Sequence, residues 1–163
     1  MDGIIERIVQ NVRDYPDFPV INDSVSNTGY TFSELDLAAR RIASKLSRLG
    51  VSRRDFVTIE LPRNKEYIAS MYAVWMVGAA FAPLSPNYPE DRLAYIRENC
   101  HAKATINEKF LRGIENEAPL DEIVYPDPAD PSLLIYTSGS TGKPKGVLHS
   151  HASICDSVLR YIG

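Results

Sequence analysis

Helical and extended patterns of hydrophobic residues alternate along the chain. Between Leu35 and Leu49 apolar residues recur every three or four positions, which predicts an amphipathic helix that ends at Gly50. Thr31 and Glu34 stand at the start of this helix with the spacing of a capping box. Residues 56–61 then alternate apolar and polar side chains, the pattern of a strand with one buried face. This succession of helices and strands predicts a layered α/β fold.

Weaker patterns predict further helices and strands on both sides of residues 31–61. The further helices that the spacing predicts cover residues 4–12, a segment capped by Asn64 that ends near Val77, a segment with Pro89 at its first position, and a segment capped by Ser150. The further strands are expected at residues 20–21, 80–84, 102–106, 123–125 and, after a loop rich in Pro and Asp, 133–136. One side of the last helix carries an apolar stripe that another element is expected to cover, made of Ile154, Val158, Leu159 and Ile162.

One stretch is long enough to raise the question of a membrane helix. From Tyr67 to Leu84 the chain contains no charged residue. However, Ser70, Gly78 and Pro83 interrupt this stretch, and Gly78 stands where a helix would end. The better interpretation is a buried helix followed by a buried strand, both within the protein core.

Composition narrows the class of protein. The 163 residues are 44% hydrophobic and carry a net charge of -3, which is ordinary for one soluble globular domain. No basic pattern favours nucleic acid or a polybasic membrane contact, so neither is an expected partner. Two cysteines, Cys100 and Cys155, are too few for a disulfide framework, and a cytoplasmic location is expected.

The strongest chemical pattern lies in residues 133–148. An apolar, strand-like approach leads into four hydroxyl residues, three glycines and two lysines, and an apolar pair follows. Glycines let the backbone approach an anion closely, amides and hydroxyls can donate hydrogen bonds to it, and lysines supply positive charge. The segment therefore predicts a cradle for phosphate groups.

Two other interpretations of this segment compete with the phosphate cradle. A Walker-type loop needs four residues between its first glycine and the Gly-Lys pair. Here two residues separate Gly139 from Gly142, and Pro144 follows Lys143, so the spacing excludes that motif. A flexible surface turn is the other alternative, but an ordered run of this composition is unusual for a turn.

Residues 136–146 resemble the signature phosphate loop of the adenylate-forming, or AMP-forming, ligase superfamily. This superfamily includes acyl- and aryl-CoA synthetases, luciferases and the adenylation domains of nonribosomal peptide synthetases. The resemblance implies ATP and Mg2+ as cofactors. It also implies that the β- and γ-phosphates are held by Thr137, Ser138, Gly139, Ser140, Thr141, Gly142, Lys143, Lys145 and Gly146. No catalytic residue and no metal ligand is assigned within this chain.

Two further segments carry the same resemblance. Residues 30–35 are similar to an early structural motif of adenylation domains, and residues 78–93 to a later one in peptide synthetases, although Ser85 replaces the usual Asp. The implied function is ATP-dependent activation of a carboxylic acid, by this similarity an amino acid, as an acyl-adenylate with release of pyrophosphate. Transfer to a carrier-protein thiol would follow. An acyl- or aryl-CoA synthetase with CoA as acceptor, and a non-catalytic module that binds phosphate or a partner, remain alternatives.

The resemblance covers the whole chain but only the first part of a family member. We expect residues 1–163 to be the N-terminal part of an AMP-binding domain, with the phosphate loop at residues 136–147 and the fold incomplete at its C-terminal end. The family's ribose-binding aspartate, magnesium-associated acidic residue, acid pocket and C-terminal lysine would lie beyond this segment. A separate C-terminal part of the enzyme is thus an expected partner.

Histidine and cysteine offer one more candidate site. His149 and His151 would share a face if they lay in one strand, but no further ligands are spaced to complete a metal site. We expect these histidines at a junction between a strand and a helix. Cys155 falls on the apolar side of the last helix and is expected to be a small buried hydrophobic residue.

Overall fold

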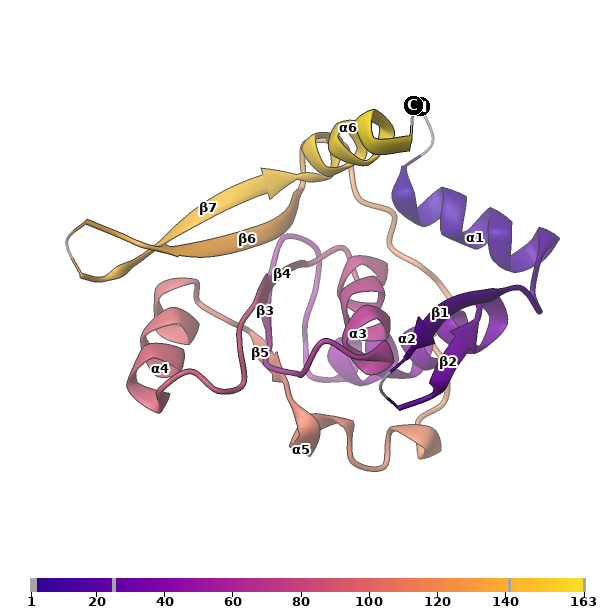
Figure 1. Cartoon of the computed structure of the whole chain (residues 1–163), viewed down its shortest axis with the longest axis horizontal. Helices are drawn as coiled ribbons and strands as arrows, with labels where there is room; N and C mark the ends of the chain where they lie inside the picture. Colours follow the sequence, from indigo (N-terminus) through magenta and orange to yellow (C-terminus); the bar gives the residue numbers. More distant parts are fainter. Residues whose placement is uncertain (1–2, 25, 141, 163) are drawn as a thin grey trace.

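The computed structural model describes residues 3–24, 26–140 and 142–162. Its helices, shown in Figure 1, are α1 (Ile4–Asp14), α2 (Phe32–Arg48), α3 (Lys65–Met76), α4 (Glu90–Asn99), α5 (Glu108–Leu111), the short 3-10 helix η1 (Ile114–Asn116) and α6 (His151–Ile162). Its strands are β1 (Pro19–Asp23), β2 (Thr28–Thr31), β3 (Phe56–Ile59), β4 (Ala80–Pro83), β5 (Ala104–Ile106), β6 (Pro131–Ser138) and β7 (Pro144–Ser150). Thr141, one of the predicted phosphate-binding residues, lies outside the described residues.

Five strands form one sheet in the order β5-β3-β4-β6-β7. The first four are parallel, and β7 runs antiparallel to β6. Helices connect successive parallel strands, since α3 leads from β3 to β4 and α4 leads from β4 to β5. Strands β1 and β2 form a separate antiparallel pair. The predicted layered α/β fold is confirmed.

The main core cluster joins α2 and α3 to strands β3 and β4. Helix α3 is deeply buried within it, and Ala69, Ala73 and Met76 have no exposed surface. The charge-free stretch at residues 67–84 is therefore core, as its interruptions predicted. None of the described helices combines the length and the hydrophobicity that a membrane span requires.

Side-chain caps explain where three of the helices begin. The amide of Glu34 donates to Oγ1 of Thr31 (3.3 Å) and the amide of Thr31 donates to Oε2 of Glu34 (2.8 Å), so the predicted capping box is confirmed. The side chains of Asn64 and Ser150 accept amide hydrogen bonds in the first turns of α3 and α6, as predicted.

Two local predictions are wrong. Residues 123–125 form no strand, because their backbone has no neighbouring strand to pair with and the amide of Val124 instead donates to the carbonyl of Met76 (2.9 Å). Pro89 occupies the cap position before α4 rather than the first turn. Its carbonyl accepts the amide of Leu93 (3.1 Å) and so opens the helix from outside.

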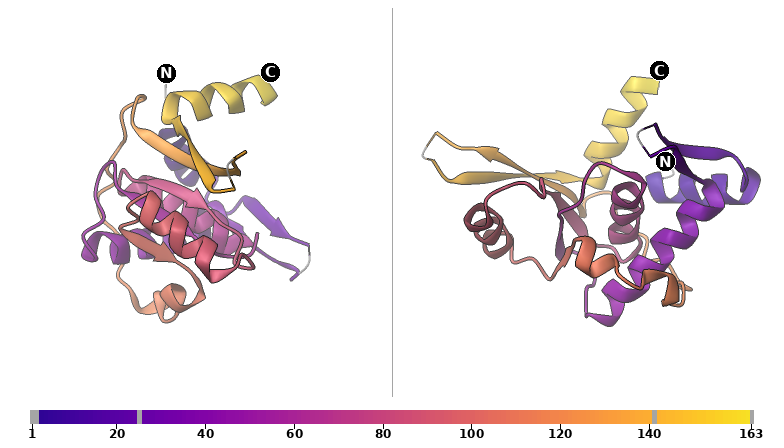
Figure 2. Two further views of the ribbon diagram at one scale, coloured as in Figure 1. Left: turned by 90° about the vertical axis from the view of Figure 1, so that its left-hand side faces the viewer. Right: turned by 60° about the horizontal axis from the view of Figure 1, so that its bottom comes forward.

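Strands β6 and β7 form a long hairpin that extends away from the body of the molecule and carries its tip past α4 (Figures 1 and 2). The register pairs Pro131 with Ser150 at the base and Ser138 with Pro144 at the far end. Only the base of the hairpin, at Leu133, pairs with β4 in the sheet. The predicted phosphate loop is therefore the far end of this hairpin.

Candidate phosphate-binding site

The base of the hairpin is fixed by a buried carboxylate just before β6. Asp130 has no exposed surface, and its two oxygens accept hydrogen bonds from Nε of Arg53 (2.6 Å) and Nε of Arg54 (2.8 Å). The amide of Asp127 donates to the same carboxylate (2.9 Å). The hydrogen bond from Arg53, helped by that from Arg54, holds the pKa of the Asp130 carboxyl well below its usual range despite the opposing effect of burial. This buried charge is therefore compensated and held in place.

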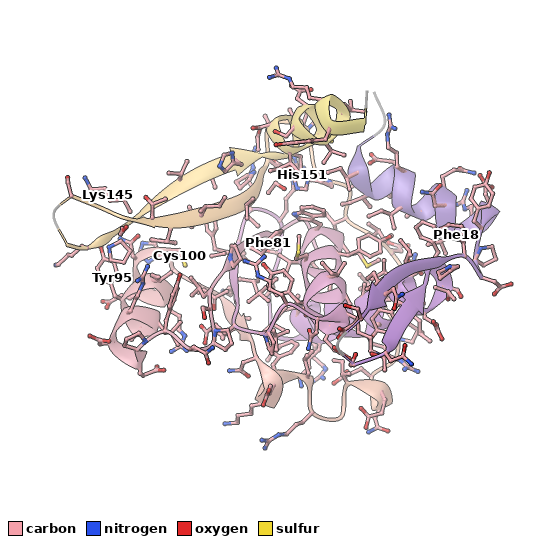
Figure 3. All side chains as sticks on the ribbon, in the orientation of Figure 1. Phe18, Phe81, Tyr95, Cys100, Lys145 and His151 are labelled. Carbon is pink, nitrogen blue, oxygen red and sulfur yellow. The ribbon has the colours of Figure 1, made fainter. Side chains whose placement is uncertain are left out.

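Both strands of the hairpin are anchored at that base. The carbonyl of Asp130 accepts the amide of His151, the first residue after β7 (3.1 Å). The indole of Trp75 donates to the carbonyl of Ser132 (3.1 Å), and the Trp75 ring meets the imidazole of His151 edge-on, with 5.6 Å between centroids. Burial lowers the pKa of His151 from its ordinary value. The neutral imidazole is thus part of the packing at this junction, shown in Figure 3.

The tip of the hairpin faces solvent. Strand β6 ends at Ser138 and β7 begins at Pro144, and the described tip residues between them are 139, 140, 142 and 143. The amide of Gly142 donates to the carbonyl of Gly139 (3.2 Å). Gly142 has a φ of 81°, in the left-handed region that glycine adopts without strain. The tip is therefore closed by a turn that leaves the side chain of Lys143 exposed.

The strands divide the predicted ligands between two faces of the hairpin. Directly opposed residues of an antiparallel pair share a face, and successive residues along a strand alternate. Thr137 and Lys145 are opposed, so they lie on the outer, exposed face. Ser138 and Pro144 are opposed on the inner face, which is also that of Tyr136, whose side chain meets α4. The residues of the predicted cradle are thus divided between the two faces of one hairpin.

Gly146 allows Tyr136 to lie across the hairpin. A Cβ at position 146 would lie 2.9 Å from Cδ1 of Leu134 and 3.3 Å from the ring of Tyr136, which is the residue opposite. The Tyr136 hydroxyl donates to Oδ1 of Asn99 in α4 (2.6 Å). Burial raises the pKa of Tyr136 to about 12, so the hydroxyl remains a donor. Tyr136 therefore holds the hairpin against α4 through this hydrogen bond. The absence of a side chain at Gly146 makes room for the Tyr136 ring.

Helix α4 forms a wall beside the inner face of the tip. Between them is a cavity of about 240 Å³ that is lined by Asp91, Arg92 and Tyr95 of α4 and by Ser138, Gly142 and Pro144 of the hairpin. Nζ of Lys143 stands 5.8 Å from the centroid of the Tyr95 ring. Figure 3 shows Tyr95 between α4 and the hairpin that carries Lys145. The tip thus has one lysine beside α4 and another on its outer face.

The predicted phosphate-binding residues that the structure describes therefore all lie on one hairpin, in its turn and the strand ends that flank it. The loop motif gives α4 no role in the site. A signal was nevertheless present, because Arg92, Tyr95 and Asn99 are spaced three and four positions apart and so share one helix face. Nothing local in the sequence indicates that this face meets a hairpin some forty residues later.

The other candidate residues lie away from the tip. His149 belongs to β7 and His151 begins α6, as the sequence predicted for a strand-to-helix junction. Within the described ranges no three His, Cys, Asp or Glu side chains are grouped so that they could hold a metal ion. Cys155 is half-buried rather than buried, and with His151 it lines a cavity of about 320 Å³ that α1 and α6 help to form. That cavity contains no residue of the predicted loop.

Similarity to known proteins identifies the family to which this chain belongs. Residues 8–162 match the family model described as AMP-binding enzyme, and the chain belongs to this family of adenylate-forming ligases. Members of the family use ATP and generally Mg2+. Within the family, this chain is most like the adenylation domains of nonribosomal peptide synthetases.

One such relative is the nonribosomal peptide synthetase sidE of Aspergillus fumigatus. It is 34% identical to this chain in an alignment 168 positions long, gaps included, that covers 93% of this chain and 8% of that protein. The chain spans 13% or less of the length of the curated relatives it matches first.

Solved structures show the same fold. The N-terminal domain of FACL13 from Mycobacterium tuberculosis matches with a TM-score of 0.82 and 21% identity, over 93% of this chain and 45% of that one. The N-terminal subdomain of NpsA from Klebsiella oxytoca, solved in complex with 3-hydroxybenzoyl-AMSN, matches with a TM-score of 0.79 and 23% identity, over 93% of this chain and 41% of that one. The fold is that of the N-terminal subdomain of adenylate-forming ligases.

Proposed function

We propose that this chain is the N-terminal part of an adenylation domain and that it holds the ATP phosphates of an enzyme that activates an amino acid. The observation that carries the proposal is the tip of the β6–β7 hairpin, where glycines, hydroxyls and lysines gather at the end of an anchored hairpin in a member of the AMP-binding enzyme family. The enzyme would be cytoplasmic, which agrees with the free thiols of Cys100 and Cys155.

In the proposed reaction a carboxylate oxygen attacks the α-phosphorus of ATP, the bond from the α-phosphorus to the bridging oxygen breaks, and pyrophosphate leaves. Negative charge shifts toward the β- and γ-phosphates as that bond breaks, and fixed donors and cations stabilise it. The residues proposed to do so are Thr137, Ser138, Gly139, Ser140, Thr141, Gly142, Lys143, Lys145 and Gly146. Mg2+ bound to the polyphosphate would neutralise further charge, and no described residue of this chain is assigned to hold it.

The amino-acid substrate and a carrier-protein acceptor are proposed because the relatives by sequence include several peptide synthetases, at 31 to 35% identity. The solved fatty acyl-CoA synthetase of Mycobacterium tuberculosis, with a TM-score of 0.79, keeps an acyl-CoA synthetase as the second candidate. Transfer of the activated acid to CoA rather than to a carrier-protein thiol would distinguish the two enzymes.

The test is exchange of radiolabelled pyrophosphate into ATP, measured with the standard amino acids and with several aryl and fatty acids. The 163-residue chain alone should give no exchange, because positioning both reactants contributes roughly 7–11 kcal/mol and this part can position only ATP. Adding the C-terminal part of an adenylating enzyme, or using a longer polypeptide that contains this chain, should restore exchange. Exchange by the chain alone would contradict the proposed division, and no exchange in the longer polypeptide would favour a non-catalytic module.

In an active polypeptide, Thr141→Ala and Lys145→Ala should each lower kcat more than they raise KM for the acid. The expected loss in kcat is on the order of 2–4 kcal/mol per donor, because these groups would act on charge that develops only in the reaction. If kcat falls by the same factor as KM rises, or if neither changes, these two residues do not belong to the phosphate site.

A further inference from the structure

We propose that α4 is the second wall of the phosphate site and that Arg92 is a further phosphate-binding residue, which contacts the terminal phosphate groups from the inner face of the hairpin. This inference rests on the proposed function, since it needs a polyphosphate at the hairpin tip. It assigns a role to α4, which lies outside the loop motif at residues 136–146.

The cavity between α4 and the tip is the first observation behind this proposal. Its volume of about 240 Å³ is enough for a phosphate group with water, and both of its walls carry polar groups. Arg92 lies on one wall and Ser138 and Gly142 on the other. An anion in this cavity would therefore touch residues of the predicted loop and of α4 together.

The second observation is that Arg92 has a guanidinium group without a carboxylate partner among the described residues. Its Cζ stacks 4.1 Å from the centroid of the Tyr88 ring, and its buried Nε has no hydrogen-bond partner. Arg97, on the same helix, instead pairs with Glu60 (2.5 Å) and Glu90 (2.6 Å). A stacked guanidinium with free donors is already oriented, and its planar fork matches phosphate oxygens.

The local charges also favour an anion. Lys143 adds a second cation beside this wall, since its Nζ stands 5.8 Å from the Tyr95 ring centroid. Asp91 is the opposing charge in the cavity lining, and its Oδ1 accepts the amide of Arg92 (2.9 Å) at the start of α4, so the two cations outnumber the one carboxylate. Lys145 lies on the outer face, so Arg92 would supply the inner face with a cation held by a helix rather than by the turn.

Binding of pyrophosphate to the 163-residue chain tests this assignment. Amide and arginine Nε–H signals would be followed by NMR at low salt, with AMP as the comparison ligand. We expect the loop amides and the Arg92 Nε–H to shift with pyrophosphate, and Arg92→Gln to weaken pyrophosphate binding about tenfold, the loss of one charge-assisted hydrogen bond. AMP has no terminal phosphates, so it should not shift the Arg92 Nε–H signal. Amides far from the tip should be the same in Arg92→Gln and in the wild type, whereas a general loss of structure would shift them throughout the chain. Arg92→Lys should recover part of the affinity.

Arg63→Gln is the matched control variant. Arg63 also stacks on a tyrosine, with Cζ 4.7 Å from the Tyr67 ring centroid, but it lines a different hollow beside β1. Its removal should change pyrophosphate affinity less than twofold. If pyrophosphate shifts the loop amides equally in Arg92→Gln and in the wild type, the role of Arg92 is overturned and the proposed function stands. If it shifts no loop amide in the wild type, the proposed phosphate function fails and this assignment fails with it.

Discussion

The two ends of the β6–β7 hairpin differ in almost every physical respect. At the base, Asp130 and Ser132 have no exposed surface and His151 is 6% exposed. At the tip, the side chains of Lys143 and Lys145 are exposed, and a single described backbone bond closes the turn. The base is therefore stabilised by buried contacts, and the tip is left accessible, as the proposed phosphate site requires. Local opening should cost little at the tip and much at the base.

In the hairpin, the contacts that stabilise the fold and the groups available to a ligand lie at opposite ends. A loop that meets a highly charged ligand gains little from burial, and its donors must remain free. Two anchors set its position instead, the base bonds around Asp130 and the Tyr136–Asn99 contact with α4. Substitutions at the base should therefore change the free energy of unfolding, and substitutions at the tip should change ligand binding.

The largest expected effect is that of Asp130→Ala. It removes the acceptor of two charge-assisted hydrogen bonds and of the Asp127 amide, and should lower the free energy of unfolding by about 3 kcal/mol. Urea unfolding of the 163-residue chain measures this. The matched control is Asp127→Ala, which also breaks an ion pair with Arg53, but at a side chain that is 68% exposed, and should cost less than about 1 kcal/mol. Equal costs for the two variants would contradict the view that the buried carboxylate anchors the hairpin.

Two glycines sharpen the comparison between the anchored part and the tip. Gly146→Ala places a Cβ 2.9 Å from Cδ1 of Leu134 and 3.3 Å from the Tyr136 ring, and should cost about 2 kcal/mol, since the Leu134 side chain must shift and the ring must give way. Gly142→Ala meets no atom within 4 Å, so its cost should be limited to about 1 kcal/mol for a left-handed φ of 81°. Thermal unfolding of both variants would rank them, and a more costly Gly142→Ala would reverse the proposed order of rigidity.

Local sequence patterns predicted the elements that position the hairpin but not how they meet. The capping box at Thr31 and the caps at Asn64 and Ser150 each depend on residues within one turn, and all three are confirmed. Residues 123–125 have the composition of a strand but no neighbour to pair with, and strand formation depends on that neighbour.

The candidate site was predictable to the same extent. The motif placed its glycines, hydroxyls and lysines in one segment, and the structure keeps them in one hairpin. The division into an inner and an outer face depends on the β6–β7 register, and the wall formed by α4 depends on the Tyr136–Asn99 contact across 37 residues. Neither can be read from local spacing.

The buried His151 at the base of the hairpin predicts that the free energy of unfolding depends on pH. Burial lowers its pKa in the folded chain, so between that pKa and the unfolded value near 6.5 the unfolded chain binds more protons. Stability should therefore be complete above about pH 6.5 and should decline as the pH falls below that value. Urea midpoints at several pH values measure the decline, and His151→Phe should reduce it. His149→Gln, two residues earlier in β7, is the control and should leave it in place.

The smallest expected change in stability is that of Lys145→Ala, and it tests the comparison most directly. The Lys145 side chain is exposed on the outer face and takes no part in the bonds at the base, so its loss should change the free energy of unfolding by less than about 0.5 kcal/mol. The same variant should strongly weaken pyrophosphate binding if the tip holds phosphate. Urea unfolding and pyrophosphate titration of one protein sample give both values. A stability loss as large as that of Asp130→Ala would mean that the tip is part of the folded framework, because a solvent-facing lysine has no other way to contribute so much.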